Sequence, residues 1–293
     1  MSVGQGLKNY WELIKPKIVL LLVFTGIAAM LVAYRVEGLT PKPLQLVVGF
    51  AAIFLGSAGA EVLTNYHDRD IDGIMKRTKN RPIPSGRISP RAALAFGIVA
   101  SILSVVLAYW FNWLAAFFML FGLVDNVGVY SLWLKRRSWL NIILGGVSGG
   151  MPVLVGYAAV AGTISWLAIF MCAMVVVWIP THIWSLSIKL KDEYKEAGVP
   201  MLPVIVNERL ATVCIAFTSA LLAVFSFAVF LVTSVSIPYI VVASAAGAVI
   251  IGYSLKLTVD RTEKTAWTLF KLSSPYLTVI FTVLVLNFWL FGA

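Results

Sequence analysis

Two short acidic stretches, each placed where a long apolar segment ends, hold the residues best suited to chemistry. Asn65, Asp68 and Asp72 are spaced by three and four residues, so on a helix their side chains share one face. One amide and two carboxylates offer several oxygens to a hard divalent cation such as Mg²⁺. Asp192 and Glu196 form a second acidic face. If both faces lie on one side of a membrane, they predict metal binding from opposite walls of one cavity.

Basic residues accompany both acidic stretches. Lys76, Arg77 and Arg81 follow Asp72 along the chain, and Lys189 precedes the second stretch. Carboxylates that hold a metal beside ammonium and guanidinium groups are typical of a diphosphate site, because metal and cations together neutralise the leaving oxygens. Charged residues at a helix end can instead form a solvated cap. The presence of two acidic faces favours the metal site.

The composition is that of an integral membrane protein. Hydrophobic residues make up 60% of the chain, charged residues 12%, and the mean hydropathy is +0.92, outside the range of soluble domains. Apolar segments of roughly 20 residues can each cross a hydrocarbon core of about 30 Å as a helix. We therefore predict an all-helical, polytopic protein with one domain over 1–293. The nine predicted spans are 17–34, 44–65, 91–110, 113–134, 140–161, 165–188, 210–232, 238–257 and 269–291.

The placement of charge predicts the orientation. With the N-terminus in the cytoplasm, only Arg35 and Lys42 of the 23 basic residues fall in outer loops, as the positive-inside rule expects. Both acidic stretches then face the cytoplasm and the C-terminus lies outside, which we expect to be across the cell membrane. The net charge of +10 follows from this topology and from anionic headgroups, so a nucleic acid partner is not needed to explain it.

We also make predictions for the N-terminal residues 1–17 and for the two cysteines. Residues 1–17 lack the apolar core of a secretory signal, so we expect them to stay in the mature chain as an amphipathic helix at the membrane interface. Cys172 and Cys214 lie within predicted spans, and we expect two buried thiols without a disulfide or a metal.

Two ionisable side chains fall inside predicted spans. Glu61 lies one turn before Asn65 and either lines a substrate chamber or is a protonated packing group. Steps of three and four residues place His182 on one predicted helix face with Lys189, Asp192 and Glu196, roughly 15 Å from Asp192. Its imidazole can bind haem iron or carry a proton, or it can be a packing group bonded to a backbone carbonyl near Pro180.

Hydroxyl and basic groups also follow the fourth span. Tyr130, Ser131 and Lys135 can donate to phosphate oxygens at the cytoplasmic rim. Lys135, Arg136 and Arg137 can equally be charges that only fix the membrane orientation.

These stretches resemble those of a known family. The N-x-x-D-x-x-x-D pattern from Asn65 and the RTKNRP that follows it resemble the first acidic motif of the UbiA superfamily of intramembrane prenyltransferases. KDEYKEAGVPMLPV from Lys191, LIKPK from Leu13 and LKRRSWLNIILGGVSGGMPVLVG from Leu134 are similar to the protoheme IX farnesyltransferase (haem O synthase) branch. Glu196 is a departure, since the superfamily's second motif often ends in Asp.

The resemblance implies a helical bundle around a central cavity open toward the cytoplasm, with two Mg²⁺ ions binding farnesyl diphosphate. The implied metal ligands, which are also the catalytic residues, are Asn65, Asp68, Asp72, Asp192 and Glu196. The implied diphosphate contacts are Lys76, Arg77, Arg81, Tyr130 and Lys135. From their own positions in the sequence, the further candidate substrate-binding residues are Ser131, Lys189, His182 and Glu61.

The implied reaction transfers the farnesyl group to a vinyl group of haem b, which is a substrate rather than a cofactor, and gives haem O. Implied partners are the lipid bilayer and haem A synthase or terminal-oxidase assembly factors. A prenyltransferase for quinone precursors or glycerol-phosphate lipids would share both acidic stretches without needing His182. A transporter is the alternative from another class, because broken helices and midplane charges also serve transport; acid and base clustered at one membrane face argue against it.

Overall fold

The fold is a bundle of long helices, seen in a computed structural model that describes residues 3–292. These residues form no β-strand, and nine helical segments among them are long and apolar enough to cross a membrane. The spans are α2 (Pro16–Val36), α3 (Pro43–His67), α5 (Pro90–Phe111), α6 (Trp113–Val124) with the π-helix η1 (Asp125–Leu134), α7 (Asn141–Leu144) with α8 (Val147–Ala161), α9 (Trp166–Lys189), α12 (Glu208–Ala228) with the 3₁₀ helix η2 (Val229–Leu231), α13 (Ile237–Asp260) and α14 (Glu263–Phe291). The short helices are α1 (Val3–Leu13), α4 (Arg69–Ile74), α10 (Lys191–Glu196) and α11 (Leu202–Ile205).

The nine predicted spans are confirmed, most of them to within three residues at each end. The largest difference is at α14, which begins at Glu263 although the apolar segment begins at Leu269. Thr262 caps this helix by accepting a hydrogen bond from the Thr265 amide, so the helix starts in polar sequence. Cys172 is buried as expected, whereas Cys214 is only half-buried, and both are free thiols.

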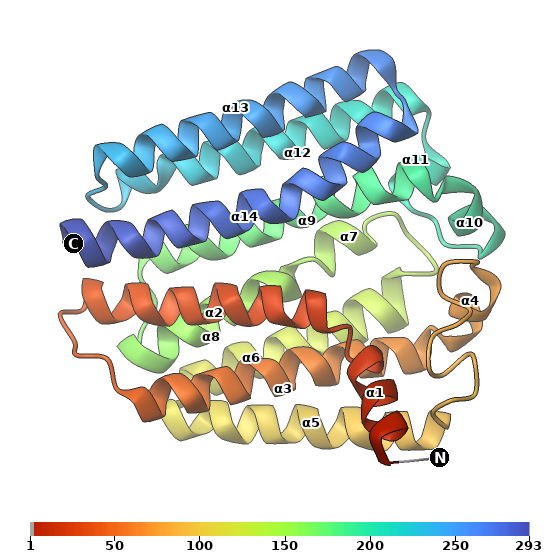
Figure 1. The fold of residues 1–293 in the computed structure, drawn as a ribbon, viewed down its shortest axis with the longest axis horizontal. Helices are drawn as coiled ribbons and strands as arrows, with labels where there is room; N and C mark the ends of the chain where they lie inside the picture. Colours follow the sequence, from red (N-terminus) through yellow and green to blue (C-terminus); the bar gives the residue numbers. More distant parts are fainter. Residues whose placement is uncertain (1–2, 293) are drawn as a thin grey trace.

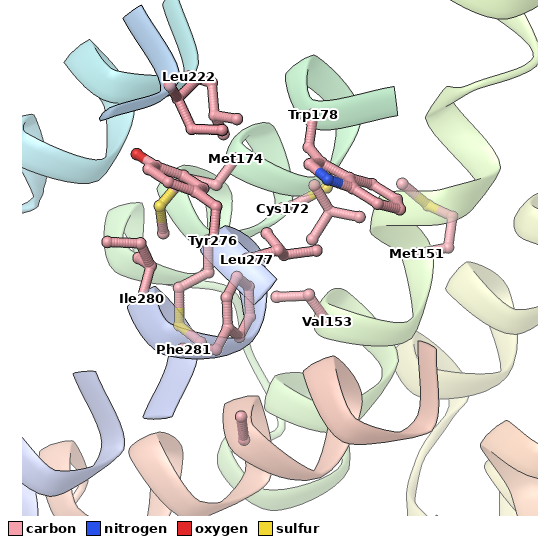
Figure 2. Close-up of a cluster of buried hydrophobic side chains, with 14 of the residues drawn as sticks. Met151, Val153, Cys172, Met174, Trp178, Leu222, Tyr276, Leu277, Ile280 and Phe281 are labelled. Atoms are coloured by element: carbon pink, nitrogen blue, oxygen red, sulfur yellow. The ribbon is translucent and has the colours of Figure 1, made fainter. Parts of the chain in front are cut away.

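The long helices run side by side, with α5 at one edge of the bundle and α12 and α13 at the other (Figure 1). Between these edges lie α2, α8, α9 and α14, which pack on one another. Gly26 and Gly156 let α2 and α8 touch along their backbones, because a Cβ on Gly156 would stand 2.1 Å from the Gly26 carbonyl oxygen. A buried apolar cluster joins α8, α9, α12 and α14, and Figure 2 shows Met151, Trp178, Leu222 and Phe281 within it.

The short helices α1, α4, α10 and α11 gather at one end of the bundle, opposite to the C-terminus (Figure 1). We call this the acidic end, because it carries both acidic stretches. Arg87 lies in the loop between α4 and α5 and connects that loop to α1 by donating to both carboxylate oxygens of Glu12, at 2.6 and 2.8 Å. The fold therefore brings the two stretches to the same end of the molecule, as their proposed cooperation requires.

Candidate functional site

The first acidic stretch bends where α3 ends. The helix stops at His67, Asp68 forms the junction, and α4 begins at Arg69, so the three predicted ligands do not lie on one continuous helix. All three side chains are nonetheless buried. The Asn65 side-chain amide donates to the Leu13 carbonyl at 2.8 Å, which leaves its own oxygen facing elsewhere.

Two buried oxygens of this stretch lack hydrogen bonds. Asn65 Oδ1 and Asp68 Oδ1 have no hydrogen-bond partner among residues 3–292. Leaving a buried acceptor unpaired costs about 1–3 kcal/mol, more for a charged group. An amide and a carboxylate oxygen are ligands that Mg²⁺ accepts, so these atoms fit a hard cation. Within the described residues, no three His, Cys, Asp or Glu side chains are grouped closely enough to hold a metal by themselves.

Cations from other parts of the chain meet these carboxylates. Lys135 Nζ pairs with Asp68 Oδ2, and Arg81 Nη1 donates to both oxygens of Asp72 at 2.8 and 2.7 Å. Burial on its own would lower the pKa of Lys135, but Tyr130 and Asp68 outweigh burial and raise its pKa above the usual range. The Lys135 ammonium therefore lies against the Asp68 carboxylate and does more than fix the membrane orientation.

The π-helix η1 places Tyr130, Ser131 and Lys135. Wide π-helical turns are rare and occur frequently at functional sites. The Lys135 amide donates to the Tyr130 carbonyl at 2.8 Å, and the Lys135 ammonium lies 5.3 Å from the centre of the Tyr130 ring. The buried Ser131 hydroxyl is a third oxygen without a partner in the described chain. Gly145 permits the close approach of η1 and α7, because a Cβ there would stand 2.3 Å from Tyr130 Cβ.

The second acidic stretch differs from the prediction. We expected His182, Lys189, Asp192 and Glu196 on one helix face, and this is wrong because α9 ends at Lys189 and a new helix, α10, begins at Lys191.

On α10, Asp192 and Glu196 are exposed, while Tyr194 is buried. The intervening Glu193 accepts a hydrogen bond from the Arg77 backbone amide at 3.1 Å, so the two stretches do touch. The Lys76 and Arg77 side chains are exposed beside this contact.

Lys15 is a residue of the site that the sequence reasoning did not single out. Its ammonium lies 2.7 Å from Glu61 Oε2, and both side chains are largely buried. Its backbone has φ +52°, a left-handed conformation that costs a non-glycine residue about 1–3 kcal/mol and tends to occur at functional sites. Burial lowers the pKa of Lys15, and the nearby Glu61 opposes that effect. The available signal was the Lys-Pro pair in LIKPK, since a residue before proline is restricted.

A cavity extends from Glu61 between α2, α3, α6 and α8. Asn126 and Ser148 line it together with Glu61, and Leu22, Ile53 and Phe118 provide apolar walls. Ile53 and Glu61 are eight residues apart on α3, so the lined stretch is about 12 Å long. Glu61 lines this cavity, and its ion-pair partner is Lys15. That the cavity is a substrate chamber stays a prediction.

His182 and Lys189 contact α14 instead of the acidic residues. His182 Nδ1 lies 2.7 Å from Ser273 Oγ, so its partner is a hydroxyl and not the carbonyl near Pro180 that one interpretation expected. The exposed Lys189 places its ammonium 3.9 Å from the centre of the Trp267 ring.

Comparison with known proteins gives matches along nearly the whole chain. The model of the UbiA prenyltransferase family matches residues 21–275. The chain is 43% identical to protoheme IX farnesyltransferase 2 of Cenarchaeum symbiosum, over 95% of this chain and 94% of that protein. It is 44% identical to protoheme IX farnesyltransferase of Desulforudis audaxviator, over 97% of this chain and 89% of that protein.

Solved structures share the fold at low identity. A digeranylgeranylglyceryl phosphate synthase superimposes with a TM-score of 0.78 at 20% identity, over 96% of this chain and 98% of that one. A UbiA homolog from Archaeoglobus fulgidus bound to GPP and Mg²⁺ superimposes with a TM-score of 0.65 at 20% identity, over 94% of this chain and 99% of that one.

Proposed function

Because the chain belongs to the UbiA prenyltransferase family, we propose that it transfers the farnesyl group of farnesyl diphosphate to a vinyl group of haem b and so makes haem O. Relatives named protoheme IX farnesyltransferase are 43% and 44% identical over almost the entire chain and support this acceptor. The structural observation that carries the proposal is the group of buried, unpartnered oxygens of Asn65 and Asp68 beside Lys135.

The oxygen donors of the acidic end fit Mg²⁺. Asn65, Asp68 and Asp72 would hold it from α3 and α4, and Asp192 and Glu196 would hold a second ion from α10. When bound, Mg²⁺ supplies positive charge that stabilises the departing diphosphate. Asp192 and Glu196 are exposed on α10, and their neighbour Glu193 contacts the Arg77 backbone amide next to the first stretch.

The chain's own cations bind the diphosphate. Lys135, Arg81 and Lys15 lie beside the carboxylates of Asp68, Asp72 and Glu61, respectively. When these cations also contact phosphate oxygens, they stabilise the negative charge that grows as the carbon–oxygen bond of farnesyl diphosphate breaks. Tyr130 and Ser131 add hydroxyl donors, and the exposed Lys76 and Arg77 attract the anion at the rim.

The remaining residues keep the reactive carbon away from water. The cavity that begins at Glu61 is next to the diphosphate residues and has apolar walls, so it suits the prenyl chain. The allylic carbocation bonds to the terminal vinyl carbon of haem b, and water then adds to the adjacent carbon and releases a proton. The product is a hydroxyethylfarnesyl group, and diphosphate is the leaving group. His182, inside α9, would contact the haem.

Product analysis tests the proposal. Cells that make haem b but lack an enzyme that farnesylates it should, when they express this chain, contain a haem whose mass is increased by one farnesyl group and one hydroxyl group. Cells that express Asp68→Ala at the same level should contain only haem b. Unmodified haem b with the wild-type chain present would contradict the proposed acceptor. Prenylated quinone precursors or glycerol phosphates in the same extracts would identify a different acceptor.

The proposal includes a location. We place the acidic end on the cytoplasmic side of the cell membrane, where farnesyl diphosphate and Mg²⁺ are soluble, and the C-terminus outside. The basic residues that flank the spans support this orientation.

Haem O is an apolar product that stays in the membrane, so we further propose haem A synthase or terminal-oxidase assembly factors as neighbours there. We also propose that a single domain performs the reaction.

A further inference from the structure

His182 is held between two aromatic rings. The Trp178 ring centre is 4.6 Å from the imidazole centre with 27° between the planes, and the Phe270 ring centre is 4.3 Å away with 33°. Rings this close to the imidazole, one stacked on it and one tilted by 33°, leave little of its faces open to a ligand. The imidazole can therefore meet a ligand only with its edge.

The hydrogen bonds of Ser273 decide which nitrogen of that edge carries hydrogen. Ser273 Oγ donates its one hydrogen to the Phe270 carbonyl at 2.8 Å. A hydroxyl that donates to this carbonyl accepts in its 2.7 Å contact with His182 Nδ1, so this arrangement favours a proton on Nδ1. In a neutral imidazole, this leaves a lone pair on Nε2. Among the described residues, the hydrogen bond between this ring and another side chain is made through Nδ1.

The same serine also fixes one of the flanking rings. The Ser273 backbone carbonyl accepts a hydrogen bond from Trp178 Nε1 at 2.8 Å. Ser273 is fully buried, so neither contact is exchanged with water. A histidine that binds a metal through one nitrogen usually donates from the other to a fixed oxygen, which sets its tautomer and orientation. His182 has this arrangement, and the rings of Trp178 and Phe270 pack against its imidazole.

We propose that Ser273 is a positioning residue that keeps His182 protonated on Nδ1 and so presents the Nε2 lone pair to the iron of the haem substrate. The inference rests on the proposed function, because that function brings haem to the site. His182 lies seven residues before the end of α9, about 10 Å from the acidic end along the helix axis, within the apolar part of the bundle. A flat apolar ligand suits that depth.

The tautomer can be measured directly, since His67 and His182 are the two histidines of the sequence. The wild-type protein is labelled with ¹⁵N-histidine in lipid nanodiscs, and a His67→Gln variant assigns the signals. For His182 of the wild-type protein, we expect a protonated Nδ1 and an unprotonated Nε2. A protonated Nε2 would overturn the proposal, and this measurement needs no variant at Ser273 to fold.

Haem binding tests the consequence. Ferric haem b is added without prenyl diphosphate, and its absorption and electron paramagnetic resonance spectra report imidazole coordination. Ser273→Ala should weaken haem binding about 10-fold or more and change the spectrum, as losses of second-layer partners of metal ligands do. Ser273→Thr, which keeps the oxygen, should restore both, and Ser274→Ala is the matched control on the same helix. Wild-type affinity and spectrum in both Ser273→Ala and His182→Ala would overturn the proposal.

The proposed function and the proposed role of Ser273 are tested by different measurements. Haem O formation in cell extracts reports on the proposed function, whereas the ring-nitrogen signals and the spectrum of added haem b report on Ser273 and His182. Haem O formed by a protein whose His182 carries the proton on Nε2 would leave the function intact and remove this inference.

Discussion

Lys15 and Glu61 form a largely buried ion pair of 2.7 Å, although the backbone of Lys15 is in the left-handed region directly before Pro16. The strained lysine lies between α1 and the first span, α2, and its ammonium contacts Glu61, which lines the cavity. Lys15 therefore links α1 to the cavity that we propose for the prenyl chain.

Replacing Lys15 should weaken diphosphate binding. In Lys15→Ala, the diphosphate loses one cation and Glu61 loses its partner, so we expect KM for farnesyl diphosphate to rise about tenfold, corresponding to about 1.4 kcal/mol. Lys15→Arg should retain most of the affinity. The exposed Lys17 is a matched control two residues away, and an equal effect of Lys17→Ala would show that only general positive charge matters.

The Asp68 carboxylate should be essential. Asp68→Asn removes a metal-ligand charge and leaves Lys135 buried without its counter-ion, so kcat should fall at least a hundredfold in assays of haem O formation. Asp70→Asn is the control, because its bond with Arg136 is exposed and contributes at most about 1 kcal/mol.

The Arg136 bond also lowers the pKa of Asp70 to about 2. The stability that this pair contributes is therefore present above the unfolded pKa near 4 and is lost as the pH falls through about 2. Equal activity losses in Asp68→Asn and Asp70→Asn would contradict the distinction between them.

We expect Asp192 to take part in Mg²⁺ binding although its side chain is exposed. Asp192→Ala should raise the Mg²⁺ concentration needed for half-maximal activity, with little change in thermal unfolding, because the side chain is exposed. Glu263→Ala removes an equally exposed acid at the start of α14 and should leave the Mg²⁺ requirement unchanged. An unchanged Mg²⁺ requirement in Asp192→Ala would remove α10 from the metal site.

A methyl group at Gly145 should disturb the π-helix. In Gly145→Ala, the new Cβ meets Tyr130 Cβ and Cα, so η1 must shift and carry Lys135 with it. We expect a loss of about 1–3 kcal/mol in stability and a larger fall in activity. Gly128→Ala is the control within η1, because the nearest atom to its Cβ is 3.9 Å away. Thermal unfolding of the purified proteins and product assays compare the two.

The orientation can be tested with fusions. Alkaline phosphatase, which is active only outside the cytoplasm, should be active when fused after Ala293 and inactive when fused in the loop between Met75 and Ser89. A fluorescent protein that folds only in the cytoplasm should give the opposite result. The reverse pattern would place the acidic end outside and remove its access to cytoplasmic diphosphate.

Hydrophobicity was sufficient to predict the spans, because a helix that crosses the membrane needs about 20 predominantly apolar residues. The gathering of basic and acidic residues at one end was also predictable from the sequence, and the structure adds an ion pair between Arg81 and Asp72. The two helix breaks were not, because neither Asp68 nor Leu190 stands next to the glycine or proline that usually marks one. A spacing of three and four residues predicts a shared face only while the helix continues, so the exposure of Asp192 and the burial of Tyr194 depend on packing that sequence spacing does not contain.

The hydrogen bond between the Arg77 backbone amide and Glu193 has a consequence for sequence drift. Since a main-chain group makes this link, every amino acid except proline at position 77 can preserve it. A substitution at position 77 can therefore change the charge near the proposed diphosphate site while the hydrogen bond between the segment after α4 and α10 is kept.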